Sequence, residues 1–200
     1  MSKMSEAKLL QDLLSVTKQV AERGWAPGSS GNTSVRIPNT NACLIKATGS
    51  SMTWVGPNDI LRVDPTGQVV SGQGRPSKEV RFHLGIYSKR SDVGGIVHAH
   101  PPYATSWAIA GKAFPLVTAP GKVYLVKTPI VEAAKSGSVE LAKMVTDAFT
   151  DPSIRVVLMK GHGLVAAGKT IFEAFNFMDW AEDAARAAIF TGLVGTLAKN

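Results

Sequence analysis

The sequence GGIVHAHPP occupies residues 94–102. Its first part is short, apolar and β-branched, which is typical of a strand buried inside a sheet. Pro101 and Pro102 end that strand, and Pro102 suits the first turn of a helix that we expect to run to Ala110. A buried strand that leads directly into a helix places this stretch in a layered fold of helices and strands.

The residues before this strand predict a helix, a meander and a second helix. Apolar residues recur at helical spacing through residues 5–23, and Gly24 ends that helix. Residues 76–90 return to helical character. Between them lie short β-prone runs, separated by Gly, Pro, Asn and Asp: TSVRI at 33–37, CLIKA at 43–47, ILRVD at 60–64 and QVVS at 68–71. This order predicts mostly antiparallel pairing.

The residues after it alternate between strands and helices. A helix is expected from the cap Ser138 to Phe149, and a last helix from about Thr170 to Gly192, where Thr170 and Glu173 form a capping box. The expected strands are the weaker runs FPLV (114–117) and VYLV (123–126) and the buried runs IRVVLM (154–159) and GLVAAG (163–168).

Together these elements predict an α/β fold: a three-layer α/β/α arrangement with a central, mostly antiparallel sheet. The chain has 200 residues, of which 44% are hydrophobic and 18% charged. That size suits one globular domain with a real core. We therefore expect a single domain over residues 1–200.

Composition excludes several classes of protein. The net charge is +7, but Lys and Arg are scattered without a basic stripe, so we expect a small anionic substrate and no nucleic acid. No apolar run is long enough to span a membrane, and the start of the chain lacks the features of a signal peptide, so we expect a cytoplasmic protein. The one cysteine, Cys43, excludes an intrachain disulfide and is expected to be a buried thiol without chemistry.

Three histidines predict a metal centre. His98 and His100 are two apart on the predicted strand and therefore project from the same face. His162 follows the strand IRVVLM between Gly161 and Gly163, at a strand end. Three neutral imidazoles with an open position are typical of catalytic zinc, although Mn²⁺ or Co²⁺ would also be accommodated. The fourth histidine, His83, lies among apolar neighbours in a helix and is expected to be structural.

An anion site is predicted beside Glu79. Ser77 and Lys78 precede it at a helix start, where backbone N–H groups, a hydroxyl and an ammonium suit a phosphate or carboxylate. The loops at residues 28–33 and 48–51 could add further donors. Glu79 itself, taken alone, is also an ordinary first-turn acid that the helix dipole favours.

The ordered pattern G-N-x-S, T-G, P-S-x-E-x-x-x-H, H-x-H and G-H-G across residues 25–185 resembles the class II aldolase and adducin family, and within it the L-fuculose-phosphate aldolases. The resemblance implies zinc at His98, His100 and His162, with Glu79 as the acid/base. It also implies that Gly31, Asn32, Thr48, Gly49, Ser77 and Lys78 surround a substrate phosphate, and that the protein is a homotetramer.

The implied reaction is cleavage of a ketose phosphate, such as L-fuculose 1-phosphate, to dihydroxyacetone phosphate and an aldehyde through a metal-stabilised enediolate that Glu79 protonates. The alternative is decarboxylation of a 3-oxo-acid (tetronate) phosphate, because Ser77-Lys78 stands where the aldolases usually carry Ser-Ser. No tyrosine matches the one that the family aldolase takes from a neighbouring subunit, although Tyr124 lies nearby.

Other members of the family fit less well. Its 4-epimerases carry an aspartate where this chain has Glu79, and the dehydratase of methionine salvage is less alike around PSKE, although it shares RGW-x-P near residue 25. A non-enzymatic adducin-like interaction module lacks the metal ligands that are present here.

Overall fold

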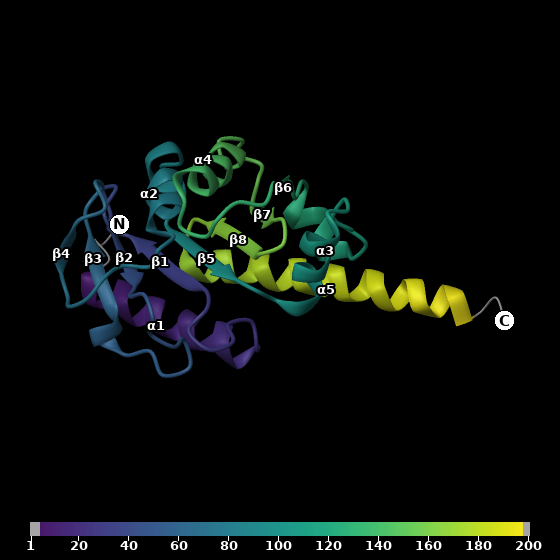
Figure 1. The fold of residues 1–200 in the computed structure, drawn as a ribbon, viewed down its shortest axis with the longest axis horizontal. Helices are drawn as coiled ribbons and strands as arrows, with labels where there is room; N and C mark the ends of the chain where they lie inside the picture. The colour runs from purple at the N-terminus through teal and green to yellow at the C-terminus, as the bar shows by residue number, and fades with distance from the viewer. Residues whose placement is uncertain (1–4, 198–200) are drawn as a thin grey trace.

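The computed structural model describes residues 5–197, and these residues form a single sheet with helices on both faces (Figure 1). The helices and strands have the following bounds: α1 Glu6–Glu22, β1 Asn32–Arg36, β2 Cys43–Lys46, η1 Pro57–Asp59, β3 Ile60–Val63, β4 Val69–Ser71, α2 Val80–Lys89, β5 Gly95–Ala99, α3 Pro102–Ala110, η2 Gly121–Leu125, β6 Ile130–Val131, α4 Val139–Ala148, β7 Val156–Met159, β8 Gly163–Gly168 and α5 Ile171–Leu197.

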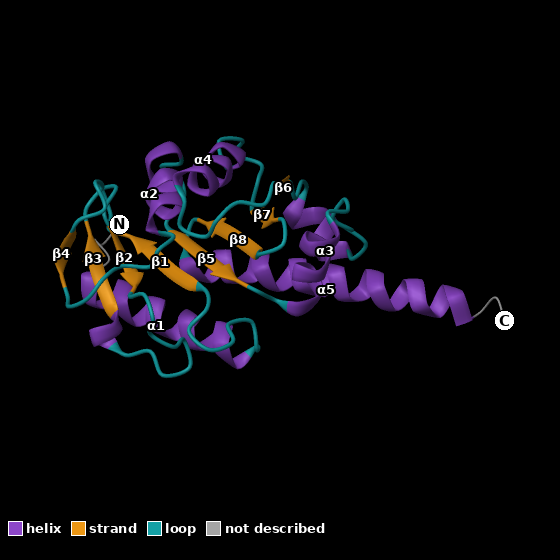
Figure 2. Cartoon of the chain, in the orientation of Figure 1, coloured by secondary structure: helices purple, strands orange, loops and turns teal. Residues whose placement is uncertain are grey.

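The described strands form one sheet in the order β4-β3-β2-β1-β5-β8-β7-β6. Every neighbouring pair is antiparallel except β6 with β7, which is parallel. Helices α2 and α4 cover one face, and α1 and α5 cover the other (Figure 2). The predicted three-layer α/β/α arrangement with a mostly antiparallel sheet is confirmed.

Strand β5 is central because it pairs with β1 on one side and β8 on the other. Its side chains alternate between the two faces of the sheet. Val97 and Ala99 belong to the core beneath α1 and α5, whereas Ile96 belongs to the core beneath α2 and α4. His98 has the parity of Ile96 and therefore points toward α2, where its ring lies edge-on to that of Phe82 at 5.9 Å.

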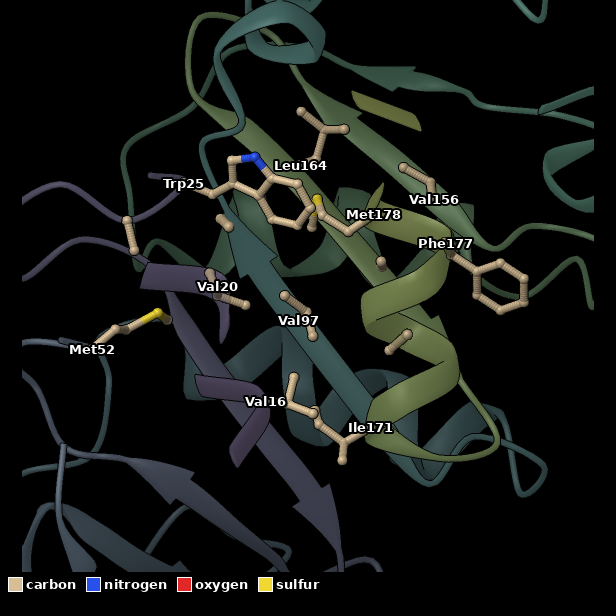
Figure 3. Packing of buried hydrophobic residues seen from close by; sticks show 14 of the residues in the cluster. Val16, Val20, Trp25, Met52, Val97, Val156, Leu164, Ile171, Phe177 and Met178 are labelled. Atoms are coloured by element: carbon tan, nitrogen blue, oxygen red, sulfur yellow. The ribbon is translucent and has the colours of Figure 1, made fainter. Parts of the chain in front are cut away.

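The core beneath α1 and α5 packs side chains from distant parts of the chain (Figure 3). Val16 and Val20 of α1 meet Val97 of β5 and Phe177 and Met178 of α5 there, all at most 4% exposed. Full burial of such side chains contributes roughly 1.5–3 kcal/mol each. This packing fixes the position of β5 and therefore of His98, which lies on it.

Most predicted helix ends are confirmed by their caps. Ser5 accepts a hydrogen bond from the backbone N–H of Lys8 at the start of α1, and Gly24 follows its end with φ +73°. Ser138 caps α4 through Leu141. Thr170 accepts from the N–H of Glu173, but the carboxylate of Glu173 accepts from Lys169 rather than from Thr170, so the predicted capping box is only half formed.

Two predicted strands are wrong. Residues 114–117 form neither helix nor strand, and residues 123–125 lie in η2, a single turn of π-helix. Val123, Tyr124 and Val126 are 65%, 48% and 56% exposed and only Leu125 of this run is buried in the core, so most of the run stays at the surface. Periodicity cannot separate a short apolar run in a strand from one in a helical turn. The short strand β6 was not predicted.

Two helix bounds also differ from the prediction. Helix α2 begins at Val80 rather than near Pro76, because Ser77 and Val80 form a turn in which Val80 N–H donates to the Ser77 carbonyl at 3.0 Å. Helix α5 continues past Gly192 to Leu197 and projects from the body of the molecule (Figure 1). Among the helices of residues 5–197, none combines the length and apolar character needed to cross a membrane.

Candidate metal and acid/base site

The three predicted metal ligands meet at one end of β5. His98 lies on β5, His100 follows the strand, and His162 lies in the turn between β7 and β8. Antiparallel pairing sets Ala99 opposite Leu164, so the end of β5 lies beside the start of β8. The ring centroids are 4.8 Å apart for His98 and His100, 4.9 Å for His98 and His162, and 5.3 Å for His100 and His162.

Two glycines allow this approach. Gly161 has φ +68°, a left-handed conformation that favours glycine. A Cβ on Gly163 would lie 2.6 Å from the Ala99 carbonyl oxygen and 2.7 Å from Cδ2 of His100. A side chain at Gly163 would therefore displace His100.

The three histidines fit a metal ion. One ligand atom from each lies within 4.8 Å of the other two. Nδ1 of His98 donates to the Leu164 carbonyl at 2.9 Å, which turns Nε2 toward the pocket and fixes the ring as a metal site requires. Nδ1 of His100 is buried and has no hydrogen-bond partner among the described residues. A buried ring nitrogen without a partner is explained by a metal ion that the three histidines would bind.

Burial keeps two of these imidazoles neutral. Loss of hydration, followed by repulsion from His98 and His162, lowers the pKa of His100 to about 3. The pKa of His162 is also lowered, by burial and by His98. Neutral imidazole is the form that binds metal.

Glu79 lies against this cluster although it is distant in sequence. It is 5% exposed; its Oε2 lies 3.0 Å from Nε2 of His98, and its Oε1 lies 3.6 Å from Nε2 of His162. Two further donors hold the carboxylate: the amide of Asn32 reaches Oε2 at 2.9 Å, and the hydroxyl of Ser136 reaches Oε1 at 2.9 Å.

These contacts set the charge of the site. Burial alone raises the pKa of Glu79, but His98, its hydrogen bond, the Asn32 amide and His162 together hold that pKa well below its ordinary value. Burial alone lowers the pKa of His98, but Glu79 and the Leu164 carbonyl have the larger, opposite effect, so that pKa lies above its ordinary value. Glu79 is thus a carboxylate, and its partner His98 carries a proton. A bound cation would take the place of that proton.

All predicted site residues line one pocket of about 350 Å³. These are Gly31, Asn32, Thr48, Gly49, Ser77, Lys78, Glu79, His98, His100 and His162. The hydroxyl of Ser30, which also lines the pocket, is buried without a partner among the described residues. The side chain of Asn32 already bonds Glu79 and His83, whereas Thr48 and Lys78 leave a hydroxyl and an exposed ammonium for an anion.

Sequence analysis missed two residues of the pocket, Lys46 and Ser136. Lys46 is 1% exposed, and its Nζ donates to Ser50 and to the carbonyl of Ala47, so it places a positive charge beneath the loop at residues 47–50. Burial lowers its pKa to about 8. A lysine within the apolar run CLIKA was the one available signal. Ser136 had none, because only the fold brings it to Glu79.

Two residues lie outside the metal cluster. His83 is fully buried and bonds Ser34 and Asn32 rather than joining the three histidines. Tyr124 stacks on Trp180 with ring centroids 4.1 Å apart and does not line the pocket within this chain.

A family pattern spans nearly the whole chain. The family model described as Class II Aldolase and Adducin N-terminal domain matches residues 11–189. The chain belongs to the class II aldolase and adducin family. The resemblance inferred from the ordered motifs is confirmed, and with it a lyase of a metal-dependent class.

Relatives within the family include both aldolases and a decarboxylase. An L-fuculose phosphate aldolase of Methanocaldococcus jannaschii is 29% identical over 184 residues, which make up 92% of this chain and 97% of the relative. A 3-oxo-tetronate 4-phosphate decarboxylase of Escherichia coli K12 is 29% identical over 192 residues, 94% of this chain and 89% of the relative. A solved structure of an L-fuculose 1-phosphate aldolase matches with a TM-score of 0.87 and 30% identity, over 98% of this chain and 91% of that one.

Proposed function

We propose that this protein is a class II aldolase that cleaves a ketose phosphate, similar to L-fuculose 1-phosphate, into dihydroxyacetone phosphate and an aldehyde. One observation carries the proposal. The carboxylate of Glu79 faces three clustered imidazoles inside the same pocket that the anion-binding loops line. Acid/base group, metal ligands and phosphate donors are therefore within reach of one small substrate.

The donor set favours zinc, which when bound to His98, His100 and His162 would supply a Lewis acid for the charge that develops on the substrate oxygens. Mn²⁺ and Co²⁺ are accommodated by the same three ligands.

The phosphate end of the substrate is held by the loops. The hydroxyl of Thr48 and the ammonium of Lys78 line the pocket, and Lys46 adds a buried positive charge beside them. Helix α2 begins at Val80, and its N-terminal end favours an anion at Ser77. These groups orient the ketose so that its reacting carbons face the carboxylate.

Glu79 transfers the proton. Its Oε2 accepts from the buried Asn32 amide and lies 3.0 Å from His98, whereas Oε1 accepts from Ser136, an exposed residue of the pocket. Oε1 is therefore the oxygen that exchanges a proton with the substrate. In the cleavage direction, the Glu79 carboxylate takes the proton of the hydroxyl on the carbon that leaves as the aldehyde, and then returns a proton to the substrate carbon from which the aldehyde has departed. General acid/base catalysis of this kind typically contributes 10²–10⁴-fold in rate.

The second candidate is decarboxylation of a 3-oxo-acid phosphate. A relative with that activity is 29% identical, as is the L-fuculose phosphate aldolase of Methanocaldococcus jannaschii, and Lys78 offers a cation that would hold an additional carboxylate. Both reactions leave the same kind of charge on the substrate and differ in the leaving group.

The test combines metal analysis with a substrate panel. We expect stoichiometric zinc in the purified protein and dihydroxyacetone phosphate released from a ketose 1-phosphate. Glu79→Gln should lower turnover by roughly 10²–10⁴-fold. Glu140→Gln, an exposed first-turn acid of α4, is the matched control and should leave turnover unchanged.

Carbon dioxide released from a 3-oxo-acid phosphate would instead establish the decarboxylase. A protein that binds no divalent metal, or full activity in Glu79→Gln, would overturn both candidates.

We also propose a cytoplasmic homotetramer. Large apolar side chains remain exposed on the projecting end of α5, at Phe190, Leu193 and Val194, which supports burial against other copies of the chain (Figure 1). Sedimentation equilibrium tests it, since a monomer at working concentration would exclude the tetramer.

A further inference from the structure

A buried chain of hydrogen bonds ends on Glu79. From the far end, the Tyr87 hydroxyl lies 2.8 Å from Ser34 Oγ, which lies 2.7 Å from Nδ1 of His83. Nε2 of His83 lies 2.5 Å from Oδ1 of Asn32, whose Nδ2 lies 2.9 Å from Oε2 of Glu79. All five side chains are at most 5% exposed.

The two elements that carry this chain explain its regularity. Glu79, His83 and Tyr87 are spaced by four residues at the start of and along α2, so they lie on one face of the helix. Asn32 and Ser34 are spaced by two on β1, so they point to one face of the sheet. Side chains from the helix and the strand alternate along the chain of hydrogen bonds.

The donors along this chain are determined by the carboxylate at its Glu79 end and by the neutral ring of His83. The carboxylate of Glu79 can only accept, so Asn32 must present its NH₂ group to it and its carbonyl oxygen to His83. That oxygen can only accept as well, so Nε2 of His83 must carry a proton. Burial lowers the pKa of His83 to about 3, so the ring is neutral and Nδ1 is an acceptor. Ser34 then donates to Nδ1, and Tyr87 donates to Ser34.

Every donor therefore points toward Glu79. Within residues 5–197, the charged and titratable groups that face this chain are the histidine cluster at the Glu79 end and, at the Tyr87 end, Cys43 and Arg36, whose guanidinium lies 4.7 Å from the centre of the Tyr87 ring. Tyr87 is 1% exposed, so the chain does not lead to solvent and does not conduct protons. Its effect is on the orientation of Asn32.

We propose that His83 is a positioning residue: as the neutral tautomer with the proton on Nε2, it fixes the Asn32 amide so that its NH₂ group always faces Oε2 of Glu79. Oε2 is then committed to Asn32, and Oε1, beside the exposed residue Ser136, is the oxygen that meets the substrate. The catalytic consequence rests on the proposed function, whereas the tautomer and the amide orientation do not.

The first experiment measures the tautomer directly in the metal-free wild-type protein. Long-range ¹H–¹⁵N correlation spectra of uniformly ¹⁵N-labelled protein separate protonated from bare ring nitrogens, and His83→Leu identifies the His83 signals. We expect Nε2 protonated and Nδ1 bare between about pH 6 and 9. A proton on Nδ1 alone, or a charged ring, would overturn the proposal whether or not the protein is a lyase.

The second experiment separates positioning from folding. His83→Leu removes the donor, and His83→Gln restores an N–H toward Asn32. We expect kcat of His83→Leu to fall by roughly 10–100-fold with KM changed by less than about threefold, and His83→Gln to recover most of it. Tyr87→Phe is the matched control, because it removes only the most distant donor and should keep kcat within about threefold.

Equal loss of kcat in both His83 variants, in step with their melting temperatures, would assign His83 a structural role only. Absence of lyase activity in the wild type across the substrate panel would contradict the proposed function, and the tautomer measurement would still decide the orientation of Asn32.

Discussion

Ser136 and Ser138 are two residues apart before α4, and their hydroxyl groups have different roles. Ser136 is an exposed residue, and its hydroxyl bonds Oε1 of Glu79, the oxygen assigned above to proton transfer. The hydroxyl of Ser138 accepts from the N–H of Leu141 and caps α4. The same loop thus contributes one hydrogen bond to the candidate site and one that caps a helix.

Substitution by alanine should separate these roles. Ser136→Ala should lower kcat roughly twofold to tenfold, because it frees one oxygen of the carboxylate, and should leave the free energy of unfolding within about 0.5 kcal/mol. Ser138→Ala should cost about 1 kcal/mol of stability and leave kcat unchanged. Turnover assays and denaturant titrations of both variants check this, and a loss of turnover confined to Ser138→Ala would contradict it.

At the scale of the element, strand β2 carries two buried side chains, Lys46 and Cys43, whose surroundings differ. Lys46 finds oxygen partners for its ammonium, whereas Cys43 packs in the core beneath α2. Burial raises the pKa of the Cys43 thiol to about 12, although Arg36 opposes the shift. The expectation of a buried thiol is confirmed.

Native protein should therefore resist thiol reagents. At about pH 8.5, where an ordinary thiol is half ionised, labelling of Cys43 should proceed only as fast as the protein unfolds, and at once in denaturant. Because the folded state keeps the proton and the unfolded state loses it, stability should fall as pH rises from about 8.5 toward 12. Rapid stoichiometric labelling of native protein would contradict this, and Cys43→Ala should remove that part of the pH dependence.

The same scale shows why two strands were predicted wrongly. Residues 114–126 are apolar enough for strands, but none of them pairs with the sheet in residues 5–197. Strand pairing depends on partners elsewhere in the chain, and local composition does not contain that information. Helices with caps, such as α1 and α4, were predicted well because capping is local.

At the scale of the whole molecule, the candidate metal site brings together side chains that lie far apart in the sequence. His98 and His162 come from β5 and the β7–β8 turn, while Glu79 precedes α2 on one face of the sheet. The unfolded chain does not hold these groups together, so a metal that binds the folded site stabilises the fold.

Metal should accordingly raise the melting temperature. At a free Zn²⁺ concentration of about 100 times Kd, the gain is about 2.7 kcal/mol, or roughly 5–10 °C for a chain of this size. Calorimetry with Zn²⁺ and then with a chelator measures the rise and its reversal. His162→Ala should show neither, and an identical rise in that variant would place the metal elsewhere.

The sequence by itself determined the family, the fold class and most of the residues that gather in the pocket. Glycine, proline and caps act locally, and H-x-H, G-H-G and P-S-x-E are short enough to be recognised where they stand. Tertiary structure alone decided how those residues are connected. His83 and Ser136 acquire their partners Asn32 and Glu79 through contacts between residues 51 and 57 positions apart, which follow from sheet register and helix packing rather than from any local pattern.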